Sequence, residues 1–211
     1  MRVTKKVKEE QLAILEETYR GAKPELIFSN AFELLIAVIL SAQCTDKRVN
    51  VTTARLFQKA ATPEAILALG LAQLEDEIRD CGLFRNKAKN IMAACQILCE
   101  KFGGQVPDSF ADLESLPGVG RKTANVVMSV AFHHPAIAVD THVFRISNRL
   151  KLATGTTPLE VEKELQRVIP RAKWSDAHHW LIWHGRKICK ARKPLCGTCP
   201  LVDVCPSALA E

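Results

Sequence analysis

The chain has 211 residues, of which 47% are hydrophobic and 25% charged, a balance typical of a globular protein. A chain of this length can form one ordinary domain or two small ones with their own cores. Its longest apolar run, residues 34–40, is too short to cross a bilayer, and residues 1–10 lack the apolar stretch of a secretory signal. We therefore expect no membrane partner and a cytoplasmic location, where cysteines stay reduced.

Helix caps and hydrophobic periodicity extend over almost the whole chain. Asn30 and Glu33 form the pattern of a capping box before an apolar run, and Thr62 and Thr157 each precede a proline at a first helical position. No segment shows the sustained alternation of a strand. We predict an all-α fold of about ten short helices, near residues 5–20, 30–43, 46–60, 63–69, 71–81, 85–102, 109–115, 121–132, 141–150, 158–169 and 175–188.

Four cysteines cluster near the carboxyl end of the chain, at Cys189, Cys196, Cys199 and Cys205. Clustered thiols are typical of a zinc site or an iron–sulfur cluster. Structural zinc sites favour two tight cysteine pairs, whereas this run has one tight pair and two outlying cysteines. The spacing therefore favours a [4Fe–4S] cluster, with zinc and buried unligated cysteines as the alternatives.

The cysteine run is accompanied by positive charge. The chain has a net charge of +6, and Arg186, Lys187, Lys190, Arg192 and Lys193 lie within eight residues. Such a run is usually a solvated surface. A loop fixed by a cluster would lose less entropy on binding, however, so these cations could contact the phosphates of a polyanion.

A short glycine motif lies between two predicted helices, in the run from Leu116 to Ala124. Gly118 and Gly120 would permit positive φ and close approach of another backbone, so that successive N–H groups could point at one phosphate. The following helix, which begins near Arg121, adds the positive end of its dipole. The motif predicts a helix–hairpin–helix that binds DNA phosphates, although a plain corner of a helical bundle could use the same glycines.

Lys122 lies in the first turn of that helix, where a cation opposes the helix dipole. An unfavourable position of this kind hints at function. A neutral lysine can attack a carbon such as C1′ of a sugar and form a Schiff base. The dipole destabilises the ammonium by at most about 2 kcal/mol, so desolvation and neighbouring cations would have to contribute as well. Lys122 could instead be one more phosphate contact.

Asp140 follows the apolar run 136–139 and directly precedes Thr141. It can cap the helix that starts there, which is the usual role of an aspartate in this position. A capping carboxylate could also stabilise positive charge that develops on a sugar and accept a proton during elimination.

Together these motifs resemble the endonuclease III family of DNA base-excision glycosylases, a branch of the helix–hairpin–helix superfamily. The resemblance covers nearly the whole chain in the same order. It is carried by residues 32–43 with Thr45-Asp46, 116–127, 137–142 with Phe144-Arg145, 178–181, 184–186 and the spacing of the four cysteines.

The resemblance implies a role for each matching residue. Lys122 would be the nucleophile and Asp140 the essential carboxylate. The four clustered cysteines would hold a [4Fe–4S] cluster, and the remaining matches would contact DNA. Among these DNA contacts, Gln43 and Leu83 would fill the gap left by an extruded nucleotide, and the others would be Gly118, Gly120, Arg121, His142, Lys190, Arg192 and Lys193.

The resemblance also implies two helical lobes with a cleft between them. Proline disfavours helical backbone at the preceding residue, so a helix must end at His133-His134-Pro135. We expect residues 24–134 to form a six-helix lobe with the hairpin. Residues 1–23 and 135–211 would form the cluster lobe.

The expected function is that of a bifunctional DNA glycosylase and abasic-site lyase. It would excise oxidised pyrimidines from duplex DNA and nick the strand 3′ to the abasic site by β-elimination, as a monomer, at the nucleoid if the source is bacterial. One alternative is an adenine-type glycosylase of the same superfamily, although such relatives usually lack a lysine at the position of Lys122. The other is a non-catalytic iron–sulfur protein that binds DNA.

Overall fold

The computed structural model describes residues 3–208, and these residues form helices without any strand, which confirms the all-α prediction. Three short 3₁₀ helices, Arg171–Lys173, Cys196–Thr198 (η2) and Val202–Val204 (η3), accompany the α-helices. The α-helices are α1 (Lys5–Thr18), α2 (Ala31–Ser41), α3 (Asp46–Lys59), α4 (Pro63–Leu69), α5 (Leu71–Glu77), α6 (Phe84–Phe102), α7 (Phe110–Ser115), α8 (Arg121–Val130), α9 (Thr141–Leu150), α10 (Pro158–Val168) and α11 (Trp174–Lys187).

Most of these helices begin at a side-chain cap, as the sequence predicts. In seven helices an oxygen of the N-cap side chain accepts a hydrogen bond from a backbone N–H of the first turn, which satisfies one of the donors left over there. The other four helices, α5, α6, α8 and α11, have no such cap; their N-cap residues are Gly70, Leu83, Gly120 and Lys173. The seven capping residues are Thr4, Asn30, Thr45, Thr62, Ser109, Asp140 and Thr157.

Two local predictions are corrected by the structure. The carboxylate of Glu33 accepts a hydrogen bond from the N–H of Ser29 at 2.6 Å, one residue before Asn30, so the predicted capping box is not closed. Helix α5 ends at Glu77 rather than near residue 81. It ends early because the chain turns there, with the N–H of Cys81 bonded to the carbonyl of Ile78 at 2.9 Å.

The chain divides into two compact units, and each has its own hydrophobic core. Unit 2 comprises Pro24–His133, and unit 1 comprises the residues up to Lys23 together with those from His134 onward. The division after His133 lies next to the predicted break at Pro135. His133 itself has a positive φ of 57°.

In unit 2 the apolar helix α2 lies at the centre of the core. Residues 32–40 are all buried, and α2 packs against α3, α6 and α8. The unit 2 core also receives Leu56 from α3, Leu98 from α6 and Val127 from α8. This packing places the carboxyl end of α2 next to the start of α6, and both segments carry predicted site residues.

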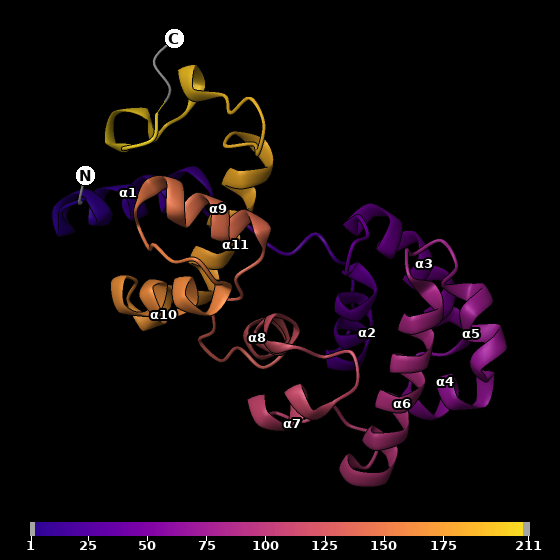
Figure 1. Ribbon diagram of the computed structural model, residues 1–211. Helices are drawn as coiled ribbons and strands as arrows, with labels where there is room; N and C mark the ends of the chain where they lie inside the picture. Colours follow the sequence, from indigo (N-terminus) through magenta and orange to yellow (C-terminus); the bar gives the residue numbers. More distant parts are fainter. Residues whose placement is uncertain (1–2, 209–211) are drawn as a thin grey trace. The chain divides into compact units, whose positions relative to one another are not determined.

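Unit 1 is assembled from the two ends of the chain. Helix α1 packs against α11 and the 3₁₀ helix η3, so the indigo and yellow segments of Figure 1 lie side by side. Helix α9 packs against α10 and α11. Leu15 and Tyr19, near the amino end of the chain, are buried with Ile146, Leu181 and Leu201, which all follow His134. The cysteine run is therefore supported from both ends of the sequence.

Within the described part of the chain, no helix is both long enough and apolar enough to span a membrane.

Candidate functional site

The predicted hairpin connects α7 to α8 in unit 2. Leu116 and Val119 are buried, and the N–H of Val119 bonds to the carbonyl of Leu116 at 3.0 Å. Gly118 has a φ of +80°, and a Cβ at this position would lie 2.9 Å from the Cβ of Asn90. Both the backbone conformation and the close approach of α6 therefore require glycine at position 118.

Gly120 has a different role from Gly118. It adopts extended backbone (φ −98°, ψ 179°) as the N-cap residue of α8, and a Cβ there would meet nothing within 4 Å. No side chain caps α8, and its first turn contains no acidic residue. The amino end of α8 thus combines the positive end of a helix dipole with open space, as an anion site requires.

Two cationic side chains flank this helix end. Lys122 lies in the first turn of α8 and is exposed. The guanidinium of Arg121 lies over the ring of Phe110, 5.0 Å from its centroid, and this contact orients it at the surface.

Asp140 lies in unit 1 and caps α9, as the sequence predicts. Its Oδ1 accepts a hydrogen bond from the N–H of Val143 at 2.7 Å. The second oxygen, Oδ2, makes no hydrogen bond within residues 3–208. One carboxylate oxygen therefore fixes the side chain, and the carboxylate also interacts electrostatically with the guanidinium of Arg145.

Gln43 and Leu83 come together in unit 2. Both have a positive φ, 53° and 59°, which is uncommon for residues other than glycine. A Cβ on Gly82 would lie 3.5 Å from the carbonyl oxygen of Gln43, so the two segments touch. Both side chains are exposed, and the apolar side chain of Leu83 has 58% of its surface accessible.

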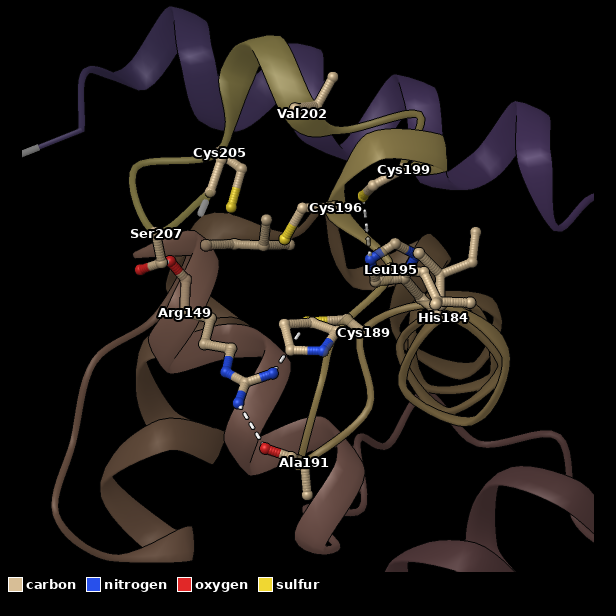
Figure 2. A pocket seen from close by; sticks show the side chains of 14 residues that line it. Arg149, His184, Cys189, Ala191, Leu195, Cys196, Cys199, Val202, Cys205 and Ser207 are labelled. Atoms are coloured by element: carbon tan, nitrogen blue, oxygen red, sulfur yellow. Dashed lines mark hydrogen bonds between the residues drawn. The ribbon is translucent and has the colours of Figure 1, made fainter. Parts of the chain in front are cut away.

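The four clustered cysteines line one cavity of about 300 Å³ in unit 1 (Figure 2). The remaining walls are largely apolar and include Leu150, Ile188, Leu195 and Val202. No set of three or more His, Cys, Asp or Glu side chains within residues 3–208 is arranged to hold a single metal ion. Four thiols around one apolar cavity match the ligand set of an iron–sulfur cluster.

Two side chains direct N–H groups at these sulfurs (Figure 2). Nη1 of Arg149 lies 3.3 Å from Sγ of Cys189, and Nε2 of His184 lies 3.8 Å from Sγ of Cys199. Arg149 also donates to the carbonyls of Lys190 at 2.7 Å and Ala191 at 3.0 Å. Such donors stabilise thiolate ligands and tune a cluster, and they are a further sign that this cavity suits one.

The orientation of His184 is fixed by Tyr19, which follows α1. The hydroxyl of Tyr19 lies 3.0 Å from Nδ1 of the buried His184. Burial raises the pKa of Tyr19 to about 12 and lowers the pKa of His184 to about 4, so near neutral pH Tyr19 is protonated and the imidazole is uncharged. A Tyr19 hydroxyl that donates to Nδ1 leaves the imidazole proton on Nε2, the nitrogen that lies 3.8 Å from Sγ of Cys199.

Helix α1 also holds the backbone around the cysteines. Nε2 of the buried Gln11 donates to the carbonyls of Leu150 at 3.0 Å and Val204 at 2.9 Å. These bonds connect α1 to the end of α9 and to the 3₁₀ helix η3, directly before Cys205. The sequence alone offered no role for Gln11, Tyr19 or Arg149, because their contacts are with residues far along the chain.

The cations of the cysteine loop are exposed at Lys190, Arg192 and Lys193. Their side chains extend from a backbone that Arg149 holds through two carbonyls. His142 is half-buried, since Gly185 approaches it so closely that a Cβ there would lie 3.0 Å from the imidazole Nδ1. Its Nδ1 is also 3.2 Å from Nη2 of Arg145, so His142 forms part of the α9–α11 contact.

Comparison with known proteins identifies the class to which this fold and site belong. Residues 36–171 match the model of the HhH-GPD superfamily of base excision DNA repair proteins, and residues 189–205 match the iron-sulfur binding domain of endonuclease III. The chain therefore belongs to this superfamily of DNA repair enzymes.

Individual relatives narrow the classification of the chain within this superfamily. Endonuclease III of Haemophilus influenzae is 52% identical over 97% of this chain and 96% of its own length, and that of Escherichia coli is 52% identical over 93% of each. A solved structure of a trapped endonuclease III–DNA covalent intermediate is 50% identical, with a TM-score of 0.94 over 98% of this chain and 97% of its own.

The chain is a member of the endonuclease III family. It is a DNA glycosylase and abasic-site lyase of base excision repair, it binds DNA, and it carries a [4Fe–4S] cluster. The alternative of a non-catalytic protein is thereby wrong. The comparisons leave the roles of single residues as predictions.

The contacts of Arg149 predict that this side chain protects the cluster. Arg149→Met removes the donor to Cys189 and the two bonds that hold the loop backbone, so the cluster should be released to a chelator about 10- to 100-fold faster, as is typical when an outer-shell partner of a metal site is lost. The decay of the visible absorbance of the cluster measures this rate.

Arg167→Met provides the matched control, because Arg167 is an exposed arginine of α10 in the same unit, paired with Glu164. It should release the cluster at the wild-type rate. Equal rates for Arg149→Met and the wild type would show that Arg149 does not protect the cluster.

Proposed function

We propose that this enzyme excises oxidised pyrimidines from duplex DNA and then nicks the strand 3′ to the abasic site, with Lys122 as nucleophile and Asp140 as the assisting carboxylate. The observation that carries the proposal is the position of Lys122, in the first turn of a helix whose end has no side-chain cap. A phosphate bound at that end would hold the DNA backbone beside the amine.

Reaching a glycosidic bond inside a duplex requires extrusion of the damaged nucleotide, which is easier where damage has weakened pairing and stacking. Neutral Nζ of Lys122 then attacks C1′, and the bond from C1′ to the base breaks, with its electron pair leaving on the base. Ring opening gives a Schiff base between Nζ and C1′. Loss of a proton from C2′ expels the 3′ phosphate, and water finally hydrolyses the Schiff base to release the enzyme.

Asp140 supports these steps through its charge. Hydrogen bonding of Oδ1 to Val143 fixes the carboxylate, and Oδ2 is left to face substrate. A fixed negative charge stabilises the positive charge that develops on the sugar as the base departs. The same carboxylate can accept a proton during the elimination.

Gln43 and Leu83 serve to fill the space that the extruded nucleotide leaves. Their segments lie in contact in unit 2, and both side chains are exposed. Leu83 offers an apolar surface that can stack against neighbouring bases, and the amide of Gln43 can hydrogen-bond to the orphaned base.

The DNA backbone is held through its phosphates. The hairpin at Gly118 and Gly120 supplies backbone N–H groups, and Arg121 adds a guanidinium. Four residues of unit 1 are further proposed phosphate contacts, namely His142, Lys190, Arg192 and Lys193. None of these contacts depends on base identity, as suits an enzyme that must find damage in any sequence.

Cys189, Cys196, Cys199 and Cys205 hold the [4Fe–4S] cluster, which has a structural role. Bound there, the cluster cross-links the loop to the core of unit 1 and so presents the loop cations to DNA. The enzyme acts as a monomer in the cytoplasm, on nucleoid DNA.

Replacement of the two catalytic side chains should separate binding from chemistry. Lys122→Gln should bind abasic duplex and keep its fold, but it should lose both nicking and the covalent complex that borohydride traps with the wild type. Near wild-type nicking by Lys122→Gln would exclude Lys122 as the nucleophile. Asp140→Asn should bind normally and turn over about 10²–10³-fold more slowly, because it loses only the charge.

Asparagine caps a helix as well as aspartate does, so Asp140→Asn keeps the hydrogen bond to Val143. Thermal unfolding should therefore match that of the wild type. If Asp140→Asn retains full turnover, the side chain serves only as a helix cap.

The phosphate contacts predict a strong dependence of binding on salt. Log affinity for abasic duplex should fall linearly with log salt, and Arg192→Gln should reduce the slope by about one, since one counterion fewer is released. Lys163→Gln, at an exposed position of α10, removes a charge outside the loop and should leave the slope unchanged. An unchanged slope for Arg192→Gln would exclude the loop from the interface.

A further inference from the structure

Lys87 is a buried lysine in the first turn of α6, with only 5% of its surface exposed. Its ammonium donates to two backbone carbonyls, those of Leu40 at 2.8 Å and Ala42 at 2.7 Å. Burial lowers the pKa of Lys87. A buried ammonium is costly unless its hydrogen bonds are satisfied, and here both of these acceptors belong to the carboxyl end of α2.

The same residue is bonded to both segments that carry Gln43 and Leu83. Its ammonium holds Ala42, the residue directly before Gln43. Lys87 itself stands in α6 four residues after Leu83, and its backbone N–H makes the first regular bond of the helix to the carbonyl of Leu83 at 3.1 Å. The two loops also meet where Gly82 approaches the carbonyl of Gln43 and where the thiols of Cys44 and Cys81 interact.

Both loops need such support because of their backbone conformation. A residue other than glycine in the left-handed region costs about 1–2 kcal/mol, and it persists only where the surroundings determine it. Gln43 and Leu83 are both in this region. The carboxyl end of α2 also has carbonyls without partners inside the helix, and the ammonium of Lys87 satisfies one of them.

We propose that Lys87 is a positioning residue for base extrusion, which holds Gln43 and Leu83 at the spacing needed to enter the duplex together. The inference rests on the proposed role of Gln43 and Leu83. Lys87 touches neither DNA nor the reacting atoms, and its effect is confined to the step in which the two side chains replace the extruded nucleotide.

Substrates that differ in the need for gap filling test this role. An abasic site in duplex DNA leaves an orphaned base to be held, whereas an abasic site in single-stranded DNA does not. Lys87→Met should nick the duplex roughly 10- to 100-fold more slowly than the wild type, since misplacement by about 1 Å can cost that much. On the single strand its rate should stay close to that of the wild type.

Two further measurements separate positioning from a general loss of structure. A 2-aminopurine opposite the abasic site should brighten less on binding Lys87→Met than on binding the wild type, because the orphaned base is disturbed less. Adding Lys87→Met to Leu83→Ala should slow duplex nicking by much less than the product of the two single effects, because both changes act on one step. Lys101→Met, at an exposed position of the same helix, is the matched control and should behave as the wild type on both substrates.

The outcomes distinguish the inference from the function on which it rests. If Gln43→Ala and Leu83→Ala nick the duplex at the wild-type rate, the gap-filling role is wrong. If those variants nick the duplex slowly but Lys87→Met does not, the positioning role is wrong. It is also wrong if Lys87→Met lowers the nicking rate equally on duplex and single-stranded DNA. Should Lys87→Met fail to fold, Lys87→Gln keeps one donor for the carbonyls of α2, and the same comparison applies to it.

Discussion

The structure depends on how the ends of its helices are satisfied. Inside a helix every backbone N–H and carbonyl has a hydrogen-bond partner. The N–H groups of the first turn and the carbonyls of the last turn have no partner within the helix. Seven helices here satisfy a leftover donor with their own N-cap side chain. Helices α5, α6, α8 and α11 do not, and the N-cap residues of α6 and α8 are Leu83 and Gly120. Leu83 and Gly120, which are among the proposed DNA contacts of unit 2, thus lie at two of these four uncapped helix ends.

Unit 1 uses a different means of ordering its surface loop. The loop from Cys189 to Cys205 contains only short 3₁₀ turns, so its conformation needs support from outside. Arg149, His184 and Gln11 provide that support by donating to sulfurs and carbonyls of the loop. In the proposed function, the [4Fe–4S] cluster adds to this support and presents Lys190 and its neighbouring cations to DNA.

Much of the fold could be predicted because helix starts are encoded locally. Thr157, for example, forms the capping box with Glu160, and the start of α8 follows from its glycines. The end of α5 was missed because the turn after Glu77 depends on tertiary contacts, among them the ion pair of Glu77 with Arg55 of α3 at 3.0 Å. The three 3₁₀ helices are too short to show any periodicity.

Only some residues of the candidate site could be predicted from the sequence. Lys122, Asp140 and the cysteines stand in motifs that can be read along the chain, whereas Lys87 and Arg149 act on residues about 40 positions away. Nothing in the sequence distinguishes Lys87 from the exposed lysines of the same helix. The two hairpin glycines also looked alike, and only the structure shows that Gly118 is required by its backbone and by Asn90 while Gly120 leaves space open.

The central claim is that the uncapped end of α8 is kept for a phosphate of the DNA. Gly120→Ser tests it most directly, because the extended backbone at this position accepts a serine and its Cβ meets no neighbour within 4 Å. The serine hydroxyl would cap α8 without adding charge, so thermal stability should stay equal or rise by a few tenths of a kcal/mol. Affinity for abasic duplex should fall about tenfold or more, as expected when roughly 1.4 kcal/mol of phosphate binding is lost. A Gly120→Ser protein that is no less stable and binds abasic duplex as tightly as the wild type would contradict the account.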